Sequence, residues 1–221
     1  MGMWKLGSWG NRLLAATAAL GLAIMPAACG GGGGGGGFVP PPPGGFTATF
    51  TTNDGGAAPN LIRLIEKPGS AVGSQITLQV TIGGTTTSQD FYAFAFDILM
   101  ADPTVVQFVA ASAVEGPFLT GSLLTVLASQ GGAANDRVIV GVSKQGAVPG
   151  NGTTNTEDVI LELTFQVIAA GSSALTITGS TSPVIPLPGC AAMAPAAIDS
   201  QNPANCITSA VFGAGGTITG T

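Results

Sequence analysis

Two aspartates that lie close together in the chain, Asp97 and Asp102, could form a paired-carboxylate site for hydrolysis. Asp97 stands between Phe96 and Ile98 in an alternating segment, so its side chain is expected to point away from the face that these two apolar residues share. Asp102 precedes Pro103, and an aspartate in such a turn commonly accepts hydrogen bonds from its own backbone. The pattern favours turn chemistry over a catalytic pair, and we predict no catalytic residues.

Histidine is absent from the sequence, which restricts metal and nucleophile chemistry further. Without imidazole, Ser-His-Asp and Cys-His catalysis and the usual zinc and copper sites are excluded. Asp54 and the Glu157-Asp158 pair could contribute to a calcium site together with loop carbonyls. No spaced string of Asp and Asn ligands accompanies them, so we interpret them as solvated loop charges and predict no metal and no cofactor.

The first of three cysteines, Cys29, ends a segment with the layout of a secretory signal over residues 1–28. Two cations precede an apolar stretch, residues 13–25, which is short for a membrane span, and small residues follow it. Ala27 and Ala28 directly before Cys29 resemble the lipobox of bacterial lipoproteins. That resemblance implies acylation of Cys29 and attachment to a lipid bilayer.

Two further residues bear on this processing. Gly30 follows the cysteine, which in the lipoproteins that the segment resembles implies the outer membrane or cell surface. Pro26 departs from the lipobox pattern, in which a leucine or similar residue is expected. Ordinary cleavage near Ala28, giving a freely secreted protein, is the alternative.

The other two cysteines, Cys190 and Cys206, enclose a segment rich in glycine, alanine and proline. In an oxidising compartment they are expected to form a disulfide that closes this loop and contributes about 3 kcal/mol in the chain-entropy picture. Two unrelated buried thiols are the alternative. A metal site is disfavoured because no histidine is available.

Residues 29–45 continue from Cys29 with GGGGGGGGFVPPPPGG and are predicted to be a disordered tether without a core of their own.

The exported part beyond the signal would carry four basic residues against eleven acidic ones, a net charge of −7. A surface of that sign repels phosphate, so we predict no nucleic-acid partner.

Residues 46–221 form the predicted folded domain, in which apolar and polar residues alternate repeatedly. Turn signals rich in Gly, Pro, Asn and Asp separate the alternating runs, and no helical periodicity is present after residue 25. We predict an all-β, antiparallel two-sheet sandwich of about nine strands. The expected strands are centred on 61–65, 76–82, 92–100, 105–110, 123–128, 138–142, 159–167, 175–178 and 207–212.

The order of these strands resembles the cohesin domain, over roughly residues 60–220. The segments that carry the likeness are GSQITLQVTIGG, YAFAFDILMADPTVVQFVAAS, RVIVGVSKQG, DVILELTFQVIA and SALTITG. The resemblance implies a jelly-roll sandwich, related in fold to some carbohydrate-binding modules, and a dockerin module as partner. Cohesins dock that partner on a flat sheet face that includes the third strand, so the candidate partner-binding face here holds Ala95, Asp97 and Leu99.

Two features depart from the cohesin pattern. Ala101 is an extra residue before Asp102-Pro103, where we expect a bulge. The segment from Gly189 to Cys206 is longer than a usual strand connection. Both are compatible with the fold, but they alter the surroundings of the expected docking face.

Three functions compete at this point. The leading prediction is a membrane-tethered, non-catalytic module that captures a dockerin-like or other exported protein. The second is a carbohydrate-binding module for polysaccharide use, although both tryptophans, Trp4 and Trp9, lie in the signal segment, and aromatic rings are the usual platforms for sugars. A hydrolase is the third and the least supported.

Overall fold

The computed structural model describes residues 45–83, 91–119, 124–145, 149–152, 157–179, 196–199 and 210–221. These residues contain thirteen strands and one short 3₁₀ turn, η1 (Pro117–Leu119). Cys29, Cys190 and Cys206 lie outside the described residues, as do the signal segment and almost all of the tether. Within the described part of the chain, no helix is long and apolar enough to cross a membrane.

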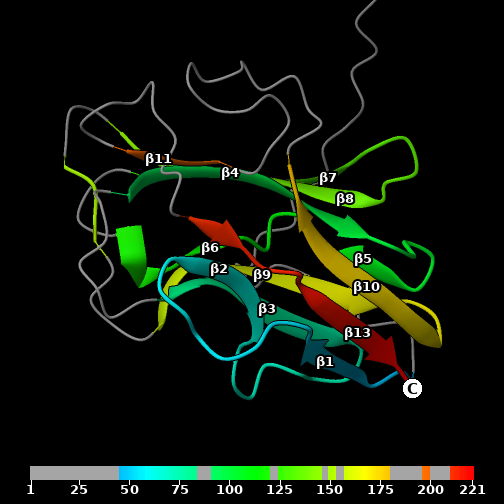
Figure 1. The fold of residues 1–221 in the computed structure, drawn as a ribbon. Coiled ribbons are helices and arrows are strands. Elements are labelled where there is room, and N and C mark those ends of the chain that lie inside the picture. The colour runs from blue at the N-terminus through cyan, green and yellow to red at the C-terminus, as the bar shows by residue number, and fades with distance from the viewer. Residues whose placement is uncertain are drawn as a thin grey trace, which may run out of the picture. The chain divides into compact units, whose positions relative to one another are not determined.

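The strands form two sheets that face each other as the layers of a sandwich (Figure 1). Sheet A, as we name the seven-stranded sheet, has the order β1 (Ala48–Thr52), β13 (Gly216–Gly220), β10 (Gly171–Thr178), β4 (Phe91–Met100), β8 (Arg137–Lys144) and β7 (Leu124–Gly131), with β11 (Ala196–Asp199) also paired to β4. Sheet B has the order β12 (Val211–Phe212), β2 (Leu61–Glu66), β3 (Gln75–Gly83), β9 (Glu157–Val167) and β5 (Val106–Phe108), with β6 (Val114–Glu115) also paired to β9.

The predicted all-β jelly-roll sandwich is confirmed, with differences in detail. The strand count exceeds nine because β1, β6, β11 and β13 were not predicted, whereas β12 lies within the strand expected at 207–212. One pair is parallel: Val211 and Phe212 of β12 lie beside Leu61 and Ile62 of β2. All other strand pairs in the described residues are antiparallel, as expected.

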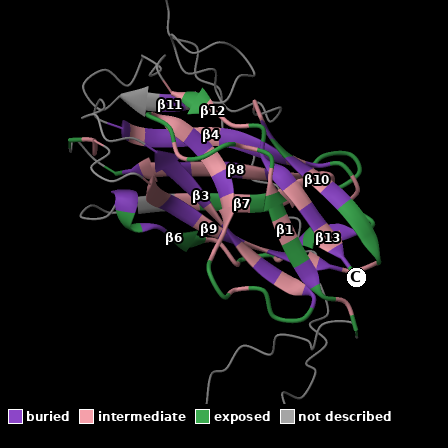
Figure 2. Ribbon diagram, turned by 60° about the horizontal axis from the view of Figure 1, so that its bottom comes forward, coloured by how far each residue is buried: buried purple, intermediate pink, exposed green. Residues whose placement is uncertain are grey.

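The core lies between the sheets and is supplied by one face of each strand. Figure 2 shows buried residues alternating with less buried ones along β4, β8 and β10. An aromatic contact joins the two sheets: the ring centroids of Phe96 on β4 and Phe212 on β12 are 6.1 Å apart. The buried apolar side chains form one continuous cluster, and its removal from water is the main driving force for this fold.

Two bulges change which residues face the core. Period-two alternation with Phe94 and Phe96 predicts Tyr92 on the core side of β4. Instead, Tyr92 is half-buried while Phe91 is fully buried, and the pairing of β11 with β4 passes from Ala93 directly to Phe91. In β9, a register shift makes both Ile160 and Leu161 core residues. An extra residue in one strand reverses which side chains face the core beyond it, and simple period-two counting does not detect this.

Ala101 does not form the bulge that we predicted. Its backbone N–H donates to the carbonyl of Ala174 at 2.9 Å, directly beyond the last pair between Met100 and Leu175. The ladder between β4 and β10 therefore continues in register past the end of β4. The extra residue is absorbed by this continuation, because its backbone keeps a hydrogen-bond partner.

Candidate functional site

The outer face of sheet A is built by four adjacent strands, β10, β4, β8 and β7. On β8, Val138, Val140 and Val142 are buried in the core, so the residues between them point outward. On β7, Val126 and Ala128 pack against the core, so Leu127 points outward. The outward positions we name the sheet A face: Thr176 and Thr178 of β10, Ala95 and Leu99 of β4, Ile139 and Gly141 of β8, and Leu127 of β7.

The seven residues of the sheet A face are uncharged, and the charged residues Asp97 and Arg137 share their outward parity. Ala95 of β4 is paired with Gly141 of β8, and Gly141 is paired in turn with Leu127 of β7. Leu127 is 55% exposed, and among the described residues Val72, Val114 and Val211 are exposed to a similar or greater extent. Small residues beside an exposed leucine give a surface of low relief that a partner could cover with apolar side chains.

Of the three residues predicted for this face, two are accessible and one is not. Ala95 and Leu99 are half-buried and point outward as expected. Asp97 has the same parity, but its exposed fraction is 0%, which corrects the expectation that it is a surface contact. Its Oδ2 atom accepts a hydrogen bond from Nη1 of Arg137 at 3.3 Å. A buried carboxylate needs such a cation, because an uncompensated charge away from water is costly.

Arg137 was not singled out by sequence reasoning. It opens β8 opposite Leu99, and its side chain is 19% exposed. Besides its bond to Asp97, its Nε donates to Oδ1 of Asp136 at 3.4 Å. The alternation Val138, Val140, Val142 was enough to place residues 137, 139 and 141 outward, but no pattern in the sequence indicates which carboxylate Arg137 would meet.

The outer face of sheet B is different, because its polar groups bond to one another across strands β2, β3 and β9. Arg63 pairs with Glu157, with Nε and Oε1 2.6 Å apart, and Thr81 donates to the same oxygen at 2.8 Å. Lys67 pairs with Glu162 at 2.6 Å, and the Gln79 amide donates to the other carboxylate oxygen of Glu162 at 2.9 Å. The hydroxyls of Thr77 and Thr164 lie 3.0 Å apart. We name this set the sheet B ladder.

The two glutamates of this ladder are held in their ionised form. Partial burial alone would raise the pKa of Glu157, but hydrogen bonds from Arg63 and Thr81, with the charge of Arg63, lower it below its usual value. The pKa of Glu162 is lowered in the same way, with burial opposed by hydrogen bonds from Lys67 and Gln79 and by the charge of Lys67. These carboxylates are therefore committed to internal partners.

The remaining candidate carboxylates also have structural roles. Oδ1 of Asp102 accepts bonds from the backbone N–H and the hydroxyl of Thr104 at 2.9 and 2.6 Å, which confirms the predicted turn chemistry. These bonds, the hydroxyl's first, lower the pKa of Asp102. The Asp54 carboxylate accepts from the backbone N–H groups of Ala214 and Gly215 at 2.6 and 3.1 Å.

The region of the suggested calcium ligands contains a cation of the protein itself. Arg63, which binds Glu157, also donates to the carbonyl of Gly55, the neighbour of Asp54. Among the residues that the structure describes, no group of three or more His, Cys, Asp or Glu side chains could hold a metal ion. The guanidinium thus compensates the charge that a calcium ion would otherwise meet at Glu157.

No protein-family model matches the sequence, and no curated protein matches it. Solved structures do match the fold. A chain from a type II cohesin–X-dockerin complex of Acetivibrio cellulolyticus superposes with a TM-score of 0.54 and 16% identity, covering 71% of this chain and 96% of that one. The chain has the cohesin fold.

Two further cohesin structures agree with this result. The second type II cohesin module of an adaptor scaffoldin from the same organism matches in two structures, with TM-scores of 0.52 and 0.51 and identities of 16% and 15%. They cover 71% and 72% of this chain and 88% and 94% of their own. The expected cohesin-like sandwich is therefore confirmed at the level of the fold, with the sheet A face on the sheet that contains β4.

Proposed function

We propose that this protein is a non-catalytic binding module, tethered to a membrane through Cys29, that captures an exported partner protein of dockerin type on the sheet A face. The observation that carries the proposal is the uncharged row Ala95, Gly141 and Leu127, which runs across three neighbouring strands of sheet A. The centre of a protein interface is depleted in charge and enriched in apolar contact. One structure with the same fold is described as a cohesin–X-dockerin complex, which supports a protein as the partner.

The sheet B ladder supports the same choice of face by contrast. Its charged groups already have partners at 2.6 Å, and a protein docking there would have to desolvate these ion pairs. Burying an ion pair under a partner adds little affinity, because the desolvation penalty offsets the attraction between the charges. The sheet A face offers apolar area without that cost.

The alternative is carbohydrate binding by a face of the same fold. Tyr92 is the one tyrosine of the chain, and it is half-buried near one end of β4. A linear array of exposed aromatic rings, which a sheet-face sugar platform requires, is not formed by the residues of the sheet A face. Protein capture is therefore the function that this face supports better.

The proposal is tested by capture of a partner with two matched variants of the full-length chain. Leu127→Lys places a charge on the sheet A face, and Val114→Lys places the same charge at an equally exposed valine, 56%, on sheet B. We expect wild type and Val114→Lys to retain one protein with duplicated calcium-loop repeats from the native proteome. Leu127→Lys should weaken that binding at least tenfold, because a lysine in an interface core must be desolvated.

Opposite results are equally clear. Retention of the wild type on insoluble polysaccharide with no protein partner would overturn protein capture. Equal loss with both lysine variants would place the docking site elsewhere. The tether is checked separately: Cys29→Ser should release the chain from the membrane fraction, because acyl chains contribute about 0.8 kcal/mol per buried CH₂.

A further inference from the structure

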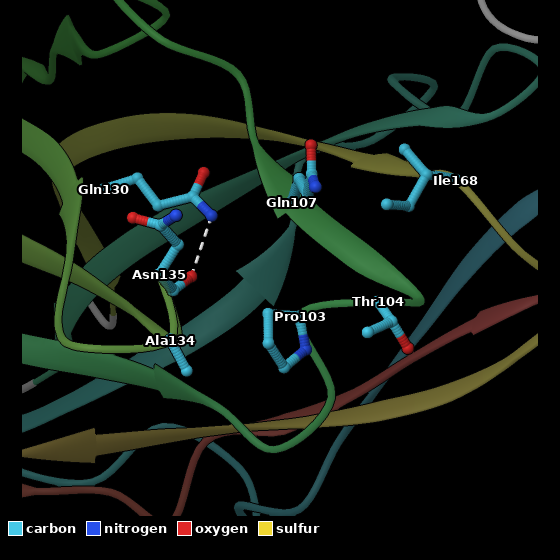
Figure 3. Close-up of a pocket in the computed structure, with 7 residues that line it drawn as sticks. All are labelled: Pro103, Thr104, Gln107, Gln130, Ala134, Asn135 and Ile168. Atoms are coloured by element: carbon cyan, nitrogen blue, oxygen red, sulfur yellow. Dashed lines mark hydrogen bonds between the residues drawn. The ribbon is translucent and has the colours of Figure 1, made fainter.

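A cleft of about 590 Å³ lies at the edge of the sandwich where the two sheets end side by side (Figure 3). One wall comes from sheet B, with Gln107 of the edge strand β5 and Ile168 just beyond β9. The opposite wall comes from sheet A, with Gln130 of the edge strand β7 and Asn135 of the turn between β7 and β8. Its volume falls within the range of about 300–1,000 Å³ typical of small-ligand sites.

The chemistry of this cleft is neutral and rich in amides. Three primary amide side chains, Gln107, Gln130 and Asn135, and one hydroxyl, Thr104, line it, and none of its lining residues is charged. A primary amide presents two donor hydrogens and an acceptor oxygen, so it can bind a ligand hydroxyl in either sense. Neighbouring hydroxyls on one ligand are therefore suited to such a set, whereas an ionised ligand would find no counter-charge.

Gln130 is polar at a position where the strand pattern calls for an apolar residue. It shares the parity of Val126 and Ala128, which pack against the core, so its side chain lies on the inner side of sheet A at the end of β7. Its Nε2 donates to the carbonyl of Asn135 at 2.8 Å, the bond drawn in Figure 3. One N–H of this amide thus orders the turn, and that bond does not use the other N–H or the amide oxygen.

The other wall is also held before a ligand arrives. The Thr104 hydroxyl donates to Oδ1 of Asp102 at 2.6 Å, so toward a ligand it acts as an acceptor. The backbone N–H of Ile168 donates to the carbonyl of Val105 at 2.9 Å, and the backbone N–H of Asp102 donates to the Ser173 hydroxyl oxygen at 2.9 Å. Preformed walls reduce the ordering cost of binding.

We propose that this cleft binds a neutral saccharide, with the amides of Gln107, Gln130 and Asn135 bonding its hydroxyls and Pro103 and Ile168 contacting the apolar side of a sugar ring. Sugar rings combine adjacent hydroxyls with an apolar face, and the lining supplies both kinds of group. The cleft contains no aromatic ring among its lining residues, so affinity is expected to be weak, with a Kd of roughly 1 mM. This site is separate from the sheet A face and does not depend on protein capture.

The test is a titration of the isotopically labelled full-length chain, followed by amide chemical shifts. The probes are cellotetraose, xylotetraose, mannotetraose and maltotetraose, each up to about 20 mM, well above the expected Kd. We expect at least one probe to shift residues of the cleft. Gln107→Ala removes an exposed amide and should weaken that binding about tenfold, whereas Asn53→Ala, which removes an exposed amide from the loop after β1, should leave it unchanged.

Each other outcome overturns the proposal. Failure of all four probes to shift cleft residues at about 20 mM would exclude neutral saccharides of this size. Shifts that survive Gln107→Ala, or that fall on the sheet A face, would place saccharide binding elsewhere. Leu127→Lys should not alter the titration, so loss of protein capture and loss of saccharide binding are distinguishable.

Discussion

The outer faces of the two sheets are built by the same alternation of strand residues, but their side chains are used differently. On sheet B, the charged side chains form ion pairs with each other. Arg63 pairs with Glu157 and Lys67 pairs with Glu162, each at 2.6 Å. On sheet A, the row Ala95, Gly141 and Leu127 is uncharged, and the outward Arg137 is paired with the buried carboxylate of Asp97. The comparison indicates that the polar groups of the sheet B face are committed to one another, whereas the uncharged row Ala95, Gly141 and Leu127 on sheet A is open to a partner.

The largest expected effect comes from the buried ion pair of sheet A. Arg137→Met removes the cation that faces Asp97, whose exposed fraction is 0%, and should lower the free energy of unfolding by about 3 kcal/mol. Lys67→Met, the matched change on sheet B, removes a cation whose side chain is 45% exposed and should cost less than about 1 kcal/mol. Urea unfolding of both variants measures the difference, and equal losses would show that burial does not separate the two pairs.

The second effect separates stability from binding on the sheet A face. Gly141 lies in the middle of β8, and a Cβ added there would meet only the Leu127 Cβ, at 4.0 Å. Gly141→Val should therefore raise the free energy of unfolding by roughly 0.5–1 kcal/mol, since glycine weakens a strand interior. The same added bulk should weaken partner capture about tenfold if the partner lies against Gly141. If the variant is more stable and binds the partner equally well, the partner does not dock on β8.

The sequence predicted the layers of this fold better than it predicted the surface of sheet A. Runs such as Val138, Val140 and Val142 determine which side of a strand is buried, and this was sufficient for the sandwich and for the outward position of Ala95 and Leu99. Alternation gives the direction of a side chain but not its depth. Asp97 points outward and is nevertheless fully buried. Its partner Arg137 lies 40 residues away in sequence, so the local pattern does not indicate this pairing.

The cleft was beyond sequence reasoning for a related reason. Its walls combine residues 103–107, 130–135 and 168, which only the meeting of two sheet edges brings together. The bulges at Tyr92 and Ile160 were also missed, since each needs knowledge of the partner strand's register. The sequence did carry one usable signal, Gln130 at an inward position of β7, which departs from the apolar pattern of its neighbours.

The smallest effect is the pH dependence of the sheet B ladder. Because the folded-state pKa of Glu157 lies below its usual value, its ion pair stabilises the fold above the unfolded-state pKa, and this stabilisation is lost as the pH falls through the folded-state pKa. Glu157→Gln should therefore make unfolding less sensitive to acid, by roughly 0.5 kcal/mol once solvent screening is allowed for. Unfolding free energies of both proteins, measured from about pH 6 to about pH 3, test this.

Arg63→Met provides the companion to this measurement, because it removes the cation that lowers the pKa of Glu157. It should flatten the same acid-sensitive part of the curve, and the double variant should add little to either single change, since both act through one pair. Neither variant should alter partner capture, because Arg63 and Glu157 lie on the outer face of sheet B. If either one reduced capture as strongly as Leu127→Lys does, the division between a self-satisfied face and a docking face would be wrong, and the partner would have to contact both sheets.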